Sequence, residues 1–241
     1  AGDFTGNRQA ILIDDDGGHV VNTPRYTADE NTLVRNIKGT IDVTGKLMAE
    51  SVTIYKGQQQ DDVEFRINHH TNKEVKDYLL ESAVDLPNFE IPDFKYDIHK
   101  ARIPSVTETL QLVSPGFASV SGKRFFITPN IMAKSPVKLK SEEQRKYDIV
   151  YNQSFRDMDT VMLEIPAGYS IEAMPKNVSL NSKFGKYEIH FSINANTIKL
   201  TRQYERTEGR FPPSDYAEFV KFYDDIYKAD RSKIVFVKKE G

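Results

Sequence analysis

The residues most able to do chemistry stand near the start of the chain, where three aspartates precede two glycines and a histidine in ILIDDDGGHVVNTP, residues 11–24. An EF-hand calcium loop beginning at Asp14 would need an oxygen ligand at Gly18, a glycine at His19 and a glutamate at Arg25. Aspartate and glycine tolerate the positive φ angles of tight turns, and apolar runs flank this stretch. We therefore interpret it as a hairpin tip, with adventitious cation binding as the alternative.

The histidines offer no clear metal or acid–base site. His69 and His70 are adjacent, so in a strand they would point to opposite faces and only a loop would let them share a metal. No acidic residue stands at ligand spacing from them. Glu188 and His190 share one predicted strand face, which is more typical of a solvated surface than of a catalytic pair. The sequence thus predicts no metal, cofactor or catalytic residue.

The absence of cysteine excludes a thiol nucleophile, a disulfide and a thiolate metal site within this chain. Phosphate-binding, dinucleotide-binding and serine-hydrolase motifs are also absent. Paired carboxylates of the glycosidase type stay open, because their spacing is set by the fold and there are 35 acidic residues. The net charge of -2 gives no reason to expect nucleic acid, and no apolar run is long enough to span a membrane.

Alternating apolar and polar residues dominate the chain and predict strands. Residues 186–193 and 197–204 alternate around a short Asn-rich loop, and residues 34–43 and 47–55 do so around Thr44-Gly45. Similar spacings recur between Pro- and Gly-marked turns, and residues 233–239 predict a charged edge strand. The sequence therefore predicts a mainly β fold, an antiparallel β-sandwich of about ten to twelve strands.

Two helices are expected at the periphery, at about residues 71–84 and 214–229. Thr71 and Glu74 have the spacing of a capping box at the start of the first. Ser214 is the expected N-cap of the second, whose aromatic residues recur at helical spacing and should cover an apolar surface. Residues 58–70 are left unassigned, because residues 61–67 alternate as in a strand while the Gln-rich start fits a helix or a loop.

Several fragments together resemble the C-terminal region of the multidomain transglutaminase-like proteins of Bacteroidetes. Their order and spacing carry the resemblance; the fragments are residues 2–4, 8–13, 22–24, 55–57, 86–89, 122–126, 129–130, 165–169, 184–187 and 216–235. Chains of that family carry an N-terminal β-sandwich, a papain-like transglutaminase domain and a C-terminal β-rich domain of unknown function. The resemblance covers nearly the whole of this chain.

The resemblance implies a fragment without the active site. The family's catalytic Cys, His and Asp lie in the middle domain, and none maps here, so no enzyme activity is expected of this chain. Residues 1–32 would be a hairpin arm or the tail of the preceding transglutaminase-like domain, and residues 33–241 the C-terminal sandwich. The opening residues contain no signal peptide and suggest a processed or excised fragment, while the family is usually exported, which implies a periplasmic or cell-surface location.

Three functions follow for testing. The first is a non-catalytic accessory domain that packs against the transglutaminase- or protease-like domain of the same polypeptide and helps bind a protein, peptide or cell-wall glycan substrate. It predicts an apolar patch near residues 1–32. The second is an independent carbohydrate- or peptide-binding module, which predicts aromatic residues along a groove away from that end. The third is a hydrolase, which predicts two carboxyl groups facing each other across a pocket.

Overall fold

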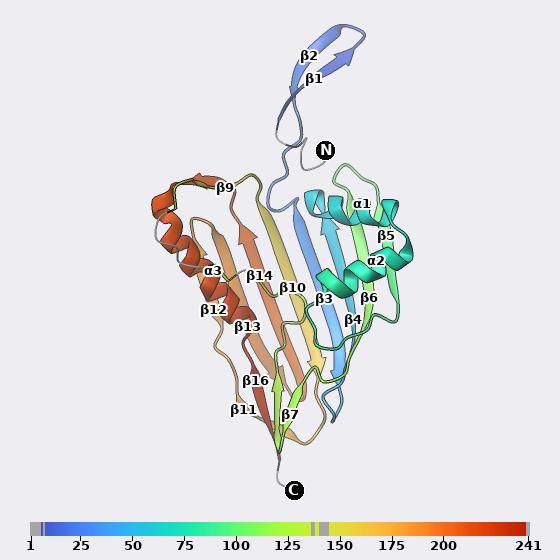
Figure 1. Cartoon of the computed structure of the whole chain (residues 1–241), viewed down its shortest axis with the longest axis vertical. Helices are drawn as coiled ribbons and strands as arrows, with labels where there is room; N and C mark the ends of the chain where they lie inside the picture. The colour runs from blue at the N-terminus through green and yellow to red at the C-terminus, as the bar shows by residue number, and fades with distance from the viewer. Residues whose placement is uncertain (1–5, 7, 136–137, 140–144, 240–241) are drawn as a thin grey trace.

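A computed structural model describes residues 6, 8–135, 138–139 and 145–239 (Figure 1). The mainly β prediction is confirmed, with more strands than expected: sixteen in the described residues. A large sheet has the order β12–β13–β14–β10–β3–β4–β6–β5, and a smaller one the order β11–β16–β8–β7. All neighbours in the large sheet are antiparallel except β10 and β3, which run parallel.

The strand bounds follow the alternating residues closely. In the large sheet they are Val178–Ser182 (β12), Gly185–Asn194 (β13), Thr197–Arg206 (β14), Phe155–Glu164 (β10), Thr32–Ile41 (β3), Leu47–Lys56 (β4), Ser105–Ser114 (β6) and Phe94–His99 (β5). In the smaller sheet they are Tyr169–Ala173 (β11), Ile234–Lys238 (β16), Arg124–Ile127 (β8) and Ser119–Ser121 (β7). Two separate pairs are Gln9–Asp14 (β1) with Gly17–Asn22 (β2), and Ile149–Tyr151 (β9) with Gly209–Phe211 (β15).

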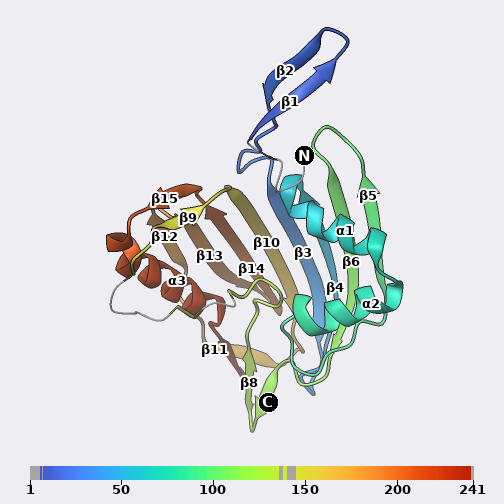
Figure 2. The same cartoon turned by 45° about the horizontal axis from the view of Figure 1, so that its top comes forward.

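The helices and the smaller sheet cover one face of the large sheet (Figures 1 and 2). The strands alternate accordingly between buried and exposed residues, as in β6 and β13. One continuous hydrophobic core lies between these layers, and its largest fully buried side chains include Tyr187, Phe125 and Phe184. The fold is thus sandwich-like on one side and open on the other. No helix of the described residues is long and apolar enough to cross a membrane.

The first predicted helix is confirmed and has a companion. The capping box is present, with Glu74 N donating to Thr71 Oγ1 at 3.3 Å and Thr71 N to Glu74 Oε2 at 2.8 Å. It begins α2, Asn72–Tyr78, which continues as the π-helical turn η2, Leu79–Ala83. The unassigned residues form the 3₁₀ turn η1, Gly57–Gln60, and helix α1, Asp61–His69.

The second predicted helix is α3, Tyr216–Asp230, and its expected N-cap was wrong. Pro213 opens a 3₁₀ turn, η3 (Pro213–Asp215), so Ser214 lies inside that turn and Asp215 is the N-cap residue of α3, although its side chain makes no capping hydrogen bond. Proline favours the first position of a helical turn, which explains the early start. The expected edge strand at 233–239 was also wrong, because β16 lies between β11 and β8.

Candidate functional site: the arm and the cavities beside it

The opening aspartates form a hairpin tip, as predicted. Strands β1 and β2 pair from Gln9 with Asn22 to Asp14 with Gly17, which leaves two residues in the turn. Gly17 adopts a φ of 121°, and Asp14 Oδ1 accepts a hydrogen bond from the Asp16 amide at 3.0 Å. We call residues 8–24 the arm. It projects from the end of the large sheet, away from both layers (Figures 1 and 2).

Toward the tip of the arm one face is aliphatic, while Gln9 and Asn22 lie on the same face at its base. Residues paired across two strands share a face, so Ile11 and Ile13 lie on the same side as Val20. These three side chains, here called the aliphatic face, are 70%, 80% and 70% exposed. The opposite face carries Leu12 beside His19, whose Nε2 lies 3.3 Å from Asp14 Oδ1. The arm thus exposes a β surface of the kind that soluble proteins normally cover.

The base of the arm is fastened to the rest of the chain, unlike its tip. Asn31 is fully buried, donates from Nδ2 to the Ser154 carbonyl at 2.9 Å and accepts at Oδ1 from the Gln59 amide at 3.0 Å. Arg25 forms an ion pair with Glu208. Asp29, which lies between Arg25 and β3 in the sequence, forms a second ion pair, with Arg156. These contacts fix the direction in which the arm leaves the sheet.

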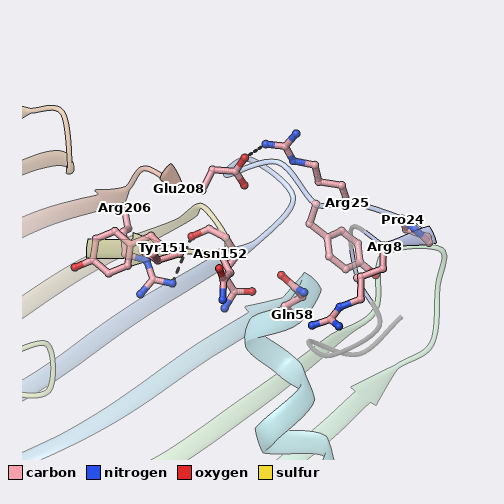
Figure 3. Close-up of a pocket in the computed structure, with 12 residues that line it drawn as sticks. Arg8, Pro24, Arg25, Gln58, Tyr151, Asn152, Arg206 and Glu208 are labelled. Carbon is pink, nitrogen blue, oxygen red and sulfur yellow. Dashed lines mark hydrogen bonds and ion pairs between the residues drawn. The ribbon is translucent and has the colours of Figure 1, made fainter. Parts of the chain in front are cut away.

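A pocket of about 490 Å³ lies at this base (Figure 3). Its lining comes from the arm, from η1 and from the segments around β9 and the end of β14, and consists of Gly6, Arg8, Pro24, Arg25, Tyr26, Gln58, Val150, Tyr151, Asn152, Gln153, Arg206 and Glu208. Figure 3 shows Arg8 beside Gln58 on one side and Arg206 beside Tyr151 on the other. Most of these groups are polar, which suits a polar or charged ligand better than an apolar one.

A second cavity, of about 400 Å³, lies between α3 and the large sheet and shares Tyr151 and Arg206 with the first. Tyr204 and Tyr223 also line it, and their hydroxyl oxygens are 2.7 Å apart. Tyr151 OH lies 2.7 Å from Tyr223 OH, and burial raises the pKa of all three phenols, that of Tyr204 to about 12. Because this cavity shares Tyr151 and Arg206 with the pocket at the base of the arm, its aromatic lining lies at the arm end of the molecule and not away from it.

A row of charges crosses the sheet beneath α3. Register places Arg35 of β3 and Arg202 of β14 directly opposite Asp159 of β10. Asp159 Oδ1 is 3.1 Å from Arg35 Nη1, and its Oδ2 is 3.2 Å from Arg202 Nη1. Arg202 Nε in turn donates to Asp230 Oδ1 of α3 at 2.8 Å. We call these four residues the charged row; all are buried, and each is paired.

Asp230 is the last residue of the charged row, and both of its carboxylate oxygens accept hydrogen bonds. Tyr187 OH donates to its Oδ1 at 2.7 Å, Asn130 Nδ2 to the same oxygen at 3.1 Å, and the Ser135 amide to Oδ2 at 2.8 Å. The carboxylate therefore joins α3 to β13, β14 and the segment that follows β8. Satisfied buried charges of this kind fix an arrangement of elements and leave no group free for catalysis.

Two carboxyl groups line the second cavity, but they do not face each other across it. Asp157 and Asp159 stand two residues apart on β10 and so share one face. Asp159 belongs to the charged row, while Asp157 Oδ1 accepts a hydrogen bond from Gln59 Nε2 at 3.0 Å. Burial raises the pKa of Asp157 to about 6. The geometry expected of a two-carboxylate hydrolase is not found in this cavity.

The histidines behave as surface residues. His190 Nε2 is 3.7 Å from Glu188 Oε2, both side chains are half exposed, and the pair lies on the solvated face of β13. His69 stacks on Phe65 with ring centroids 4.2 Å apart, and His70 Nδ1 is 3.9 Å from Glu74 Oε2. Within the part of the chain that the structure describes, no three His, Asp or Glu residues gather as metal ligands.

Sequence reasoning found the arm but missed both cavities. Their lining residues are separated by up to 202 positions along the chain, from Gly6 to Glu208, and meet only in the folded chain. One signal was available. Arg202, Tyr204 and Arg206 alternate on a single face of β14, so that face could have been flagged as cationic and aromatic from the predicted strand.

Comparison with known proteins gives limited matches. Residues 123–236, just under half of the chain, match the model of a family described as a domain of unknown function with solved structure (DUF3858). This segment holds β8 to β16 and α3, including Asp159, Arg202 and Asp230, but not the arm. No curated protein matches the chain.

Among solved structures, the chain is similar to a "putative protease" from Parabacteroides distasonis. The identity is 7%, the TM-score is 0.35, and the match covers 88% of this chain and all of the other. Similarity at this level does not establish a shared fold, and no property of that protein is carried over from it.

Proposed function

We propose that this chain is a non-catalytic accessory unit whose arm packs against a transglutaminase- or protease-like catalytic domain of the same polypeptide and helps position substrate there. The observation that carries the proposal is the aliphatic face of the arm, Ile11, Ile13 and Val20, which is exposed at the end of a two-stranded hairpin that projects from the fold. The sequence resemblance points to the same arrangement, since residues 1–32 resemble the tail of such a domain.

Physical reasoning favours a partner for this face. An isolated two-stranded hairpin is marginally stable in water and needs a further surface to pack on. Burying an aliphatic side chain of this size contributes about 1.5–3 kcal/mol, so the three together provide a strong drive to associate. The charged row pairs all of its own buried charges, whereas the aliphatic face of the arm has no covering surface among the described residues.

A covalently linked domain is the partner that best fits this position. The resemblance implies a transglutaminase-like domain directly before the arm, whose base is fixed by Arg25 and Asn31. A domain preceding it in the polypeptide would therefore meet the arm at an effective concentration in the millimolar range, at which a small interface suffices. The periplasmic or cell-surface location implied by the resemblance is part of the same proposal.

Hydrogen exchange tests the proposal. The amides of residues 9–22 would be compared in this chain and in a longer polypeptide that includes the preceding domain. We expect fast exchange in the chain alone and at least tenfold slower exchange in the longer one, because docking suppresses opening of the hairpin. Equal exchange in both would contradict the proposal. So would a concentration-dependent dimer of this chain that protects residues 9–22, since the partner would then be a second copy.

A further inference from the structure

We propose that the pocket at the base of the arm binds a carboxylate group of a peptide, with Arg206 as its main ligand and Arg8 as a second cation (Figure 3). The inference does not rest on docking of the arm. It assigns a binding site and a ligand class to the body of the protein, whichever partner the arm meets.

Arg206 is held in place but not neutralised. Its guanidinium carbon lies 4.6 Å from the centroid of the Tyr151 ring and 4.5 Å from that of Phe155, so two aromatic rings fix the side chain. Its Nη2 donates to the Gln153 carbonyl at a long 3.4 Å, and its buried Nε has no acceptor. Buried donors are normally satisfied, so an unfilled Nε beside a pocket indicates a place for an acceptor oxygen.

The other arginines on strands of the large sheet show what is unusual here. Arg35, Arg156 and Arg202 each contact a carboxylate at hydrogen-bond distance. Among the described residues no carboxylate forms an ion pair with Arg206, and none pairs with the Arg8 side chain. Arg206 thus combines restricted motion with an available charge, which is the preorganisation that lowers the entropic cost of binding.

The balance of charge around the pocket favours an anion. Three arginines line it against one carboxylate, that of Glu208, which is paired with Arg25. The positive excess attracts a carboxylate, and the planar guanidinium matches its two oxygens. Guanidinium groups also bind phosphate, so the side-chain amides of the lining, and not the charge, favour a carboxylate carried by a peptide.

The remaining lining suits a peptide backbone. Gln58, Asn152 and Gln153 contribute side-chain amides, which both donate and accept hydrogen bonds, as backbone peptide groups require. The volume of about 490 Å³ lies within the usual range for small ligands. Because the pocket opens beside the arm, a bound peptide would lie next to whatever domain covers the aliphatic face.

Calorimetric titration of the full chain at low ionic strength, with four short peptides and inorganic phosphate, tests the inference. Acetyl-Ala-Glu-Ala-amide is compared with acetyl-Ala-Gln-Ala-amide, and acetyl-Ala-Ala-Ala with its C-terminal amide. We expect saturable binding only where a carboxylate is present. The first pair of peptides tests a side-chain carboxylate and the second a C-terminal one. Comparing the two pairs shows which kind of carboxylate the pocket prefers.

Variants locate the site. Arg206→Gln should weaken carboxylate binding by about tenfold or more, Arg206→Lys by less, and Arg8→Gln by a few fold. Arg210→Gln is the matched control, because Arg210 is exposed on the adjacent segment and pairs with Asp148 outside the pocket. Arg8 is exposed and its side chain has no partner among the described residues, so its replacement tests the site even if Arg206→Gln fails to fold.

Three results would overturn the inference. The first is equal binding of the acid and amide forms of both peptide pairs, or no binding of any peptide. The second is binding that Arg8→Gln and a folded Arg206→Gln leave unchanged. The third is phosphate binding that is tighter than that of either carboxylate peptide, because the pocket would then be a phosphate site.

Discussion

The arm and the sheet beneath α3 distribute polar and apolar side chains in opposite ways. The arm exposes isoleucine and valine to solvent, whereas the sheet buries two arginines and two aspartates in the charged row. Every buried charge in the row has an opposite charge within about hydrogen-bond distance, while the aliphatic face has no covering surface. The charged row therefore needs no outside partner, whereas the arm is built for contact with something else.

The largest expected effect comes from breaking the charged row. Asp230→Ala should lower the free energy of unfolding by about 3–5 kcal/mol, because it leaves Arg202 buried without its partner on α3. Urea denaturation followed by circular dichroism measures the loss. Asp224→Ala is the matched control on the same helix, since its ion pair with Lys228 is on the surface and should matter little. Equal losses would show that the row is not what fastens α3.

The second effect concerns pH. The raised pKa of Asp157, about 6 against an ordinary 3.8, means that the unfolded chain loses its proton first as pH rises. The contribution of Asp157 therefore lowers the free energy of unfolding progressively as the pH rises from about 4 to 6, and by a constant amount at higher pH. Asp157→Asn, which keeps an acceptor for Gln59, should remove this dependence and be more stable at pH 7 by on the order of 2 kcal/mol.

Denaturation midpoints of both proteins at a series of pH values measure this difference. Asp97→Asn serves as the control for removal of an exposed carboxylate. A stability difference between wild type and Asp157→Asn that stays flat from pH 4 to 7 would show that Asp157 ionises without cost.

The smallest effect on stability is expected from the arm. The double variant Ile11→Ser, Ile13→Ser should change the free energy of unfolding of the body by less than about 0.5 kcal/mol, because both side chains are exposed. Differential scanning calorimetry checks this. A large loss of stability would mean that the arm packs on the body in solution, and the contrast between the two regions would disappear.

Local patterns explain which parts of the fold were predictable. The β3–β4 and β13–β14 hairpins follow from alternation over neighbouring residues and a short turn; in the first turn, Asp42 Oδ1 accepts from the Thr44 and Lys46 amides. Helix α1 was not predictable because Asp61, Val63, Phe65 and Ile67 alternate as they would in a strand, and of these four only Val63 is buried in the helix.

Long-range register explains which parts were not. The parallel pairing of β3 with β10 joins Arg35 to Asp159 across 124 positions, and no local signal encodes it. The pocket at the base of the arm likewise brings Arg8 and Arg206 to one site from opposite ends of the chain. The arm itself was predictable as a hairpin, but the separation of its tip from the body required the structure.

The most direct test of the account is a calorimetric titration of this chain with the separately produced upstream domain. We expect saturable binding that is lost in the Ile11→Ser, Ile13→Ser variant and retained in Val120→Ser, which removes an aliphatic side chain of β7 that is 45% exposed. Binding that survives the arm variant unchanged, or no binding at high micromolar concentration, would contradict the claim that the aliphatic face docks the catalytic domain.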